Sequence, residues 1–338
     1  MTQIPRPEHP QPQMKREHWK NLNGEWDFSF DFGCSGIDQK WQEGKKDWEK
    51  KILVPFCPES DLSGIGYKDF IPGVWYHRTI TLTGEELKGH LLLHFGAVDY
   101  DARVWINGVE AGRHQGGYVS FTFDITKLVK EGENDITLFA ADDVRSGKQP
   151  KGKQSHFFYS IGCDYTRTTG IWQTVWLEWV PESYIEKVQY YPNLAEATLG
   201  IKAVVKGQGT LEAKAFYGGE PCGSVSAKSE GGTVTMTLPL SRLEKWEPGH
   251  GRLYDLTLTY GEDKVESYFG MREIRLEGEK FLINGKSVFQ RLVLDQGFYP
   301  DGIYTAPTEE ALAKDVELSM AAGFNGARLH QKVFEPLF

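Results

Sequence analysis

The last apolar run of the chain ends in side chains that could do chemistry. In the stretch "FNGARLH", Arg328 and His330 follow residues that are otherwise typical of a buried strand. Asp295 and Gln296 end an earlier apolar run in the same way. A guanidinium and an imidazole so placed can orient carboxylates or hydrogen-bond the hydroxyl groups of a ligand. The alternative interpretation is that Arg328 makes a structural ion pair and that His330 is a buried, hydrogen-bonded histidine.

A strand, a helix and a second strand must position these residues. Thr308 can cap the helix, Glu309 and Glu310 suit its first turn, and Gly323 suits its end. A strand, a helix and a strand within about 45 residues predict a βαβ unit with parallel strands. Because one helix cannot cover both faces of a parallel sheet, we interpret the segment as the start of a (β/α)8 TIM barrel. The C-terminal ends of barrel strands line the active site.

Short alternating runs rich in aromatic residues occupy the chain from residue 23 to residue 179. Runs that recur about every 8 to 12 residues are typical of β-sandwiches. The Asn107-Gly108 pair predicts a type I′ hairpin, because both of its residues readily take positive φ. We therefore predict a mainly β protein whose first domain, residues 1–181, is a jelly-roll-like antiparallel sandwich.

The composition changes after residue 183. Short runs rich in Val, Thr, Lys and Gly continue to residue 269, and they predict a small immunoglobulin-like sandwich without the antibody Cys…Trp…Cys spacing. A second hairpin pair, Asn284-Gly285, leads into the βαβ segment. The expected domains are thus residues 1–181, 182–273 and 274–338, the last being a truncated barrel.

Composition and charge exclude several classes of function. The 338 residues, 40% hydrophobic and 25% charged, are those of a globular protein with two or three domains. The net charge of -9 argues against nucleic acid and anionic membranes as partners. With no run long enough to span a bilayer, we expect a soluble protein, cytoplasmic, or periplasmic if a signal peptide was removed. Scattered cysteines predict free, mostly buried thiols at Cys34, Cys57, Cys163 and Cys222.

Several motifs recur at a spacing that resembles one known family. In chain order they are "LNGEWDF", "VPF", "VWYHRTI", "VDYDARVWINGVEAGRH", "GENDITLFAADD", "YTRTTGIWQTVWLE", "FLINGKSV" and "GFNGARLH". Together they resemble glycoside hydrolase family 2, which includes β-galactosidases, β-glucuronidases and β-mannosidases. The resemblance implies an exo-acting, retaining β-glycosidase with a β-glycoside as its carbohydrate partner.

Two glutamates carry the chemistry of such enzymes, an acid/base and a nucleophile whose carboxyl groups lie roughly 5 Å apart. The resemblance places both on later barrel strands, with the acid/base in an Asn-Glu pair. No Asn-Glu dipeptide occurs in these 338 residues. We therefore expect no catalytic residue in this sequence and no activity from the chain alone.

The resemblance also implies roles in positioning the substrate. Asp164 stands three residues before Arg167 and matches the family aspartate that reaches from the first sandwich into the sugar pocket. The alternative is that Asp164 only orders its own loop through backbone bonds. Arg167 is expected to brace that loop, and Arg328 matches the arginine that orients the active-site glutamates.

Three positions depart from the family pattern. His330 comes one residue sooner than the histidine of the usual Arg-x-x-His-Tyr-Pro. At the end of the first strand, "LVLDQGFYP" replaces a histidine-rich stretch of the family. Asp295 or Gln296 would then make the contacts of the missing histidines. Some family members carry a divalent or sodium ion, and the loss of those His and Glu residues puts these ion sites in doubt here. We therefore predict no required cofactor, although the full-length enzyme could bind such an ion. Cys57 follows "VPF" where some β-galactosidases have asparagine after "VPS", so the sugar need not be galactose.

A noncatalytic, lectin-like carbohydrate-binding module is the alternative function. It would stack a sugar on an exposed aromatic row such as Trp75-Tyr76 or Tyr118 to Phe121, although a sandwich core requires the same spacing. A lectin has no reason to carry a βαβ segment, so we favour the enzyme. The apolar faces of residues 287–329 would need cover, for example in a homo-oligomer, or would be disordered.

Overall fold

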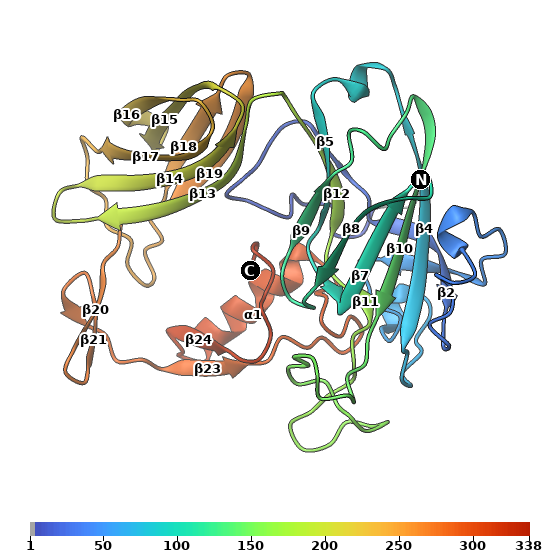
Figure 1. Ribbon diagram of the computed structural model, residues 1–338. Coiled ribbons are helices and arrows are strands. Elements are labelled where there is room, and N and C mark those ends of the chain that lie inside the picture. The colour runs from blue at the N-terminus through green and yellow to red at the C-terminus, as the bar shows by residue number, and fades with distance from the viewer. Residues whose placement is uncertain (1–3) are drawn as a thin grey trace.

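Three regions follow one another in the computed structural model, which describes residues 4–338 (Figure 1). The first and second are sandwiches of antiparallel strands, and the third lies below the second sandwich and beside the lower part of the first in Figure 1. No helix in the described part of the chain combines the length and the apolar character needed to cross a membrane.

Two antiparallel sheets face each other in the first region. The larger sheet consists, in spatial order, of β3 (Lys50–Val54), β2 (Gly24–Phe30), β4 (Gly73–Leu82), β10 (Gly132–Ala141), β7 (Asp101–Ile106) and β8 (Val109–Gln115). The smaller sheet consists of β1 (Trp19–Asn21), β12 (Val175–Val180), β5 (His90–Phe95) and β9 (Phe121–Asp124). A short ladder joins β6 (Val98–Asp99) to β11 (Gly170–Ile171), and the loops contain the 3-10 helices η1 (Trp41–Glu43), η2 (Asp61–Ser63) and η3 (Glu85–Leu87).

The aromatic residues of this sandwich form its core. Trp26, Phe28 and Phe95 are fully buried between the sheets, so that each contributes roughly 1.5–3 kcal/mol through burial. The predicted turn is confirmed, because Asn107 and Gly108 have φ of 52° and 79° between β7 and β8. The row Trp75-Tyr76 is fully buried and cannot stack a ligand.

The second region is also a sandwich of antiparallel strands. One sheet consists of β13 (Tyr184–Asn193), β14 (Thr198–Lys206) and β17 (Gly232–Pro239). The other consists of β16 (Glu220–Ser229), β15 (Gly209–Tyr217), β18 (Tyr254–Tyr260) and β19 (Asp263–Phe269). Alternate residues of these strands point into one core, whose fully buried members include Ile201, Ala213, Leu238 and Leu258. Each sheet thus contributes one apolar face to this core.

The four cysteines are free thiols, as predicted, but the expectation that most are buried is wrong. Cys57 and Cys222 are buried, whereas Cys34 and Cys163 are exposed. Both exposed thiols lie in loops, where the polar surroundings offer no apolar core to enter.

One arginine joins the two sandwiches. The Arg16 guanidinium donates to both carboxylate oxygens of Asp263 on β19, at 2.8 and 2.9 Å, and to Glu178 on β12 at 2.7 Å. It also donates to the Ile185 carbonyl at the start of the second sandwich. All three charged side chains are buried, so the junction depends on their mutual pairing.

The third region begins with a small antiparallel sheet and continues as the predicted βαβ unit. The small sheet consists of β20 (Ile274–Glu277), β21 (Lys280–Ile283) and β22 (Lys286–Ser287). The unit consists of β23 (Leu292–Asp295), α1 (Glu309–Ala321) and β24 (Gly326–Leu329), and its two strands are parallel, as predicted.

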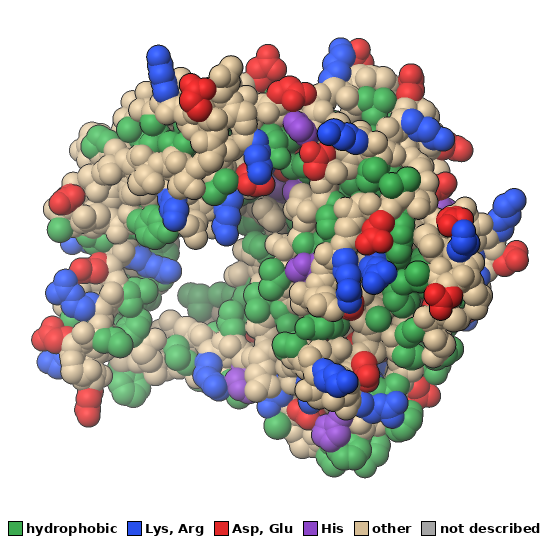
Figure 2. All heavy atoms as spheres, viewed as in Figure 1, with side chains coloured by type: hydrophobic (Ala, Val, Ile, Leu, Met, Phe, Trp, Pro, Cys, Tyr) green, Lys and Arg blue, Asp and Glu red, His purple; other side chains and the backbone are tan. Residues whose placement is uncertain are grey.

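The helix α1 begins and ends at the residues that the sequence predicts. The Thr308 hydroxyl accepts a hydrogen bond from the Ala311 amide at 3.2 Å, and Gly323 has a φ of 87° just beyond the helix. Leu312 is buried, but Val316 and Met320 on the same face are exposed. Figure 2 shows an open gap between this region and the second sandwich. That the unit opens a barrel stays a prediction.

Candidate functional site

The connection between β23 and α1 docks the third region on the first sandwich. Ile303 and Tyr304 are buried against Cys57, Ala97 and Trp172. Cys57 is therefore enclosed by protein and cannot contact a ligand. Two hydrogen bonds fix the connection, one from the Thr305 hydroxyl to the Trp172 carbonyl at 2.6 Å and one from the Ser60 hydroxyl to the Asp301 carbonyl at 2.6 Å.

A loop of the first sandwich, residues 151–165, packs against the ends of the two parallel strands. A Cβ at Gly152, whose φ is 56°, would collide with the Gln331 carbonyl and the Tyr118 hydroxyl. The ring centroid of Tyr165 lies 4.7 Å from that of Phe298. The loop that carries Asp164 and the segments that follow β23 and β24 therefore form one region of the surface.

Backbone and side-chain hydrogen bonds connect the ends of the two strands. The His330 amide donates to the Asp295 carbonyl at 2.8 Å, and the Gly297 amide donates to the Asp295 carboxylate at 2.8 Å. Lys332 donates to the Gly297 carbonyl at 2.7 Å and to the Tyr304 carbonyl at 2.6 Å. These bonds hold the residues after both strands in a fixed conformation.

Lys332 is a partly buried cation for which the sequence carries no clear signal. Its ammonium lies 4.8 Å from the ring centroid of Phe334 and 5.1 Å from that of Tyr304. Burial lowers its pKa to about 8, although nearby carboxylates oppose the shift. The alternating polar and apolar residues of "QKVFEP" could not show that this lysine turns inward.

Asp164 is half-buried and paired with a cation from its own loop. Its carboxylate lies 3.3 Å from Lys151 Nζ and 4.0 Å from His156 Nδ1. Within residues 4–338 it makes no hydrogen bond or ion pair with Asp295, Arg328 or His330. The structure thus places the loop beside the strand ends without joining these side chains directly.

Arg328 does not make the structural ion pair, and His330 is not the buried, hydrogen-bonded histidine, of the alternative interpretation. Arg328 is exposed and makes no ion pair with any described residue. His330 is half-buried, and its Nδ1 has no hydrogen-bond partner among the described residues, nor has Gln296 Oε1. Burial and the positive charges of Arg328 and Lys153 lower the pKa of His330, which favours the neutral imidazole.

Arg167 braces the loop, as predicted. It donates to the carbonyls of Ser155 and Phe157, at 3.2 and 2.5 Å, and to that of Lys68. Its guanidinium also lies 4.1 Å from the ring centroid of Phe70. Since these partners come from the loop itself and from a neighbouring loop, Arg167 fixes the position of the Asp164 loop.

Three buried carboxylates support the base of the same loop. The Asp99 carboxylate accepts a hydrogen bond from the side-chain amide of Gln154 at 2.6 Å. The side-chain oxygen of Gln154 in turn accepts one from the backbone amide of Thr168 at 2.8 Å. Glu59 accepts from the Thr169 amide and Asp142 from the Thr169 hydroxyl, both at 3.1 Å. Sequence reasoning missed this network because its members come from separate strands and loops.

Burial changes the acidity of these carboxylates. It raises the pKa of Glu59 to about 8 and that of Asp142 to about 6, and it raises that of Asp99 well above its ordinary value. Hydrogen bonds from Thr169 and Gln154 oppose the shifts without cancelling them. The charged forms are disfavoured because little solvent reaches the site.

Replacing Glu59 by glutamine should change how stability depends on pH. The pKa of Glu59 rises from 4.5 to about 8 on folding, so its contribution is complete below pH 4.5 and is lost as the pH rises through 8. Urea unfolding between pH 5 and 8 should show that the free energy of unfolding of the wild type falls by up to about 1.4 kcal/mol per pH unit relative to that of Glu59→Gln. Exposed Glu279→Gln is the control, and a constant difference across this range would contradict the assignment.

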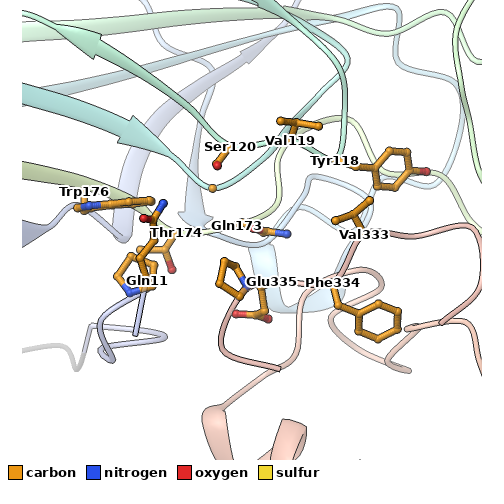
Figure 3. A pocket seen from close by; sticks show the side chains of 13 residues that line it. Gln11, Tyr118, Val119, Ser120, Gln173, Thr174, Trp176, Val333, Phe334 and Glu335 are labelled. Carbon is orange, nitrogen blue, oxygen red and sulfur yellow. The ribbon is translucent and has the colours of Figure 1, made fainter. Parts of the chain in front are cut away.

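A separate cavity lies between the first sandwich and the end of the chain (Figure 3). It measures about 190 Å³ and is lined by Tyr118, Gln173, Trp176 and Glu335, among others, but by none of the predicted site residues. Glu335 is held by Arg6 at 2.6 Å, which makes it part of a structural ion pair. Residues 4–338 also contain no group of three or more His, Cys, Asp or Glu placed to hold a metal ion.

Comparison with known proteins agrees with this architecture. Residues 19–181 match the family model described as "Glycosyl hydrolases family 2, sugar binding domain", and residues 183–272 match "Glycosyl hydrolases family 2". A β-glucuronidase of Paenibacillus borealis is 25% identical over 80% of this chain and 48% of its own length. A β-galactosidase of Lactococcus lactis is 26% identical over 91% of this chain and 32% of its own length.

Solved structures share the fold. The β-glucuronidase of Ruminococcus gnavus superposes with a TM-score of 0.80 at 20% identity, covering 94% of this chain and 55% of that one. The chain spans about half the length of the curated β-glucuronidases that it matches. With two family models matched in succession over residues 19–272, the chain belongs to glycosyl hydrolase family 2.

Proposed function

We propose that this chain is the sugar-positioning part of a retaining, exo-acting β-glycosidase. In this proposal residues 1–181 form the sugar-binding sandwich, residues 182–273 the immunoglobulin-like sandwich, and residues 274–338 the start of a TIM barrel. The nonreducing sugar lies between the first sandwich and the barrel mouth. The exposed apolar residues of α1 are the positions that further barrel elements would cover.

One observation carries the proposal. The loop with Asp164 packs against the C-terminal ends of β23 and β24, through Gly152 against Gln331 and Tyr165 against Phe298. Those strand ends are where barrel enzymes bind their substrates.

Each residue then has a distinct role. Asp164 accepts hydrogen bonds from sugar hydroxyls, while His330 and either Asp295 or Gln296 offer further polar contacts at the strand ends. Arg328, a planar bidentate donor, orients the carboxylates of the two glutamates. Those glutamates act as acid/base and nucleophile through a covalent glycosyl intermediate.

The names of related proteins guide the choice of sugar. The matched relatives include β-glucuronidases and a β-galactosidase, and one matched structure of the R. gnavus enzyme is a complex with D-glucuronic acid. We therefore propose a β-glucuronide or a β-galactoside as the substrate. The lectin-like alternative has less support, because its first aromatic row, Trp75-Tyr76, is fully buried.

Replacing Asp164 by asparagine should weaken sugar binding about tenfold or more, because a charged acceptor makes stronger hydrogen bonds than a neutral one. Saturation-transfer NMR with methyl β-D-glucuronide and methyl β-D-galactoside measures the effect on the whole chain. Asp38→Asn, at an exposed position in another loop, is the matched control. Equal binding by both variants and the wild type would remove Asp164 from the sugar site.

The chain alone is expected not to hydrolyse nitrophenyl β-galactoside, β-glucuronide or β-mannoside, because it contains no Asn-Glu pair. Release of nitrophenol, followed by absorbance, measures this. Turnover that copurifies with the chain and disappears in Asp164→Asn would show that catalytic carboxylates lie within these residues.

A further inference from the structure

The tip of the Asp164 loop exposes an unusual number of rings. Phe157, Phe158 and Tyr159 expose 41%, 63% and 63% of their surface. Figure 1 shows the loop projecting away from both sandwiches, and Figure 2 shows hydrophobic side chains at its tip. Exposed apolar side chains gathered in this way mark binding surfaces more often than single exposed residues do.

The rings form a row that begins at Asp164. The Asp164 carboxylate lies 4.0 Å from His156 Nδ1, and the His156 ring centroid lies 4.3 Å from that of Phe157. Phe157 and Tyr159 are stacked, with centroids 5.9 Å apart and planes inclined by 19°. The row therefore leads from the proposed sugar contact outward along the loop.

Hydrogen bonds hold the row in place. The Ser155 hydroxyl donates to the Tyr159 carbonyl at 2.9 Å and accepts from the Phe157 amide at 3.1 Å. Arg167 donates to the Phe157 carbonyl, and Phe158 packs edge-on against Phe70 with centroids 4.8 Å apart. Rings that are already ordered lose little entropy when a ligand stacks on them.

We infer that His156, Phe157 and Tyr159 bind the leaving-group sugar of a β-linked oligosaccharide. The inference rests on the proposed function, because the row is defined by its continuity with Asp164. The apolar face of a pyranose suits an aromatic ring, and its hydroxyls suit His156 and the Tyr159 phenol. A second copy of the chain is a poorer occupant, since a stable interface needs about 20–30 residues on each side.

The test compares short and extended ligands on the whole chain. Dissociation constants are measured for methyl β-D-glucuronide and methyl β-D-galactoside, and for β-linked disaccharides with the same nonreducing sugars. The wild type should bind the matching disaccharide about five- to tenfold more tightly than the methyl glycoside. The double variant Phe157→Ala with Tyr159→Ala should abolish this gain and leave methyl glycoside binding unchanged. The control Phe289→Ala, at an exposed ring in another region, should change the affinity for neither ligand.

The outcomes separate this inference from the proposed function. Suppose that Asp164→Asn weakens methyl glycoside binding, but that disaccharides bind no more tightly than methyl glycosides, or that the double variant still binds disaccharides more tightly. In either case the inference is overturned and the proposed function stands. A gain with nitrophenyl glycosides and not with disaccharides would assign the row to aromatic leaving groups instead. If light scattering shows a dimer that the double variant dissociates, the row is an interface between copies. Failure of any methyl glycoside to bind would overturn both proposals.

Discussion

Replacing Arg16 by methionine is expected to lower the free energy of unfolding by about 3–5 kcal/mol. The substitution preserves much of the side-chain volume but leaves Asp263 and Glu178 buried without their main cation. Because these carboxylates belong to different sandwiches, both should lose stability together. Urea unfolding followed by tryptophan fluorescence measures the change.

Two variants test this explanation. Arg113→Met removes an exposed ion pair with Asp101 and should cost less than about 1 kcal/mol. Adding Asp263→Asn to Arg16→Met should restore part of the loss, because one stranded charge is removed. A loss below about 1 kcal/mol in Arg16→Met would mean that the buried network contributes little to the junction.

Replacing Tyr304 by alanine is expected to undock the third region, at a cost of about 3–5 kcal/mol for a buried aromatic side chain. Tyr304 packs against Trp172 and Phe298 and is almost fully buried. Hydrogen exchange should become faster throughout residues 296–338. The core strands of the first sandwich should retain their protection.

The controls separate packing from hydrogen bonding. Tyr304→Phe keeps the ring and loses the hydrogen bonds of the hydroxyl, including the 3.1 Å contact with the Tyr118 hydroxyl, so it should stay docked. Phe289→Ala removes a highly exposed ring from the same region and should have little effect. Unchanged exchange in Tyr304→Ala would show that other contacts hold the region in place.

Local features of the fold could be predicted because local chemistry determines them. The two Asn-Gly turns, the Thr308 cap, Gly323 beyond the helix and the parallel strand pair all follow from neighbouring residues. The alternation of apolar residues likewise revealed the sandwiches, because it reflects which face of each strand is buried.

Contacts between distant parts of the chain were not predictable in the same way. The sequence drew attention to Arg328 and His330, but nothing near Tyr304 showed that it would meet Trp172, and nothing near Glu59 showed that it would meet Thr169. Such pairs arise only when separate elements pack together. The same limit explains the wrong expectation for Cys34 and Cys163, whose exposure depends on how loops cross the surface.

The docking of Ile303 and Tyr304 on Trp172 has a consequence for how the chain is made. Trp172 leaves the ribosome well before Tyr304, so the surface that receives the tyrosine exists when the βα connection emerges. The first sandwich can therefore present a complete docking surface before the parallel βαβ unit, whose strand pairing is non-local, begins to form. Synthesis in the opposite order would leave that connection without a surface to fold against.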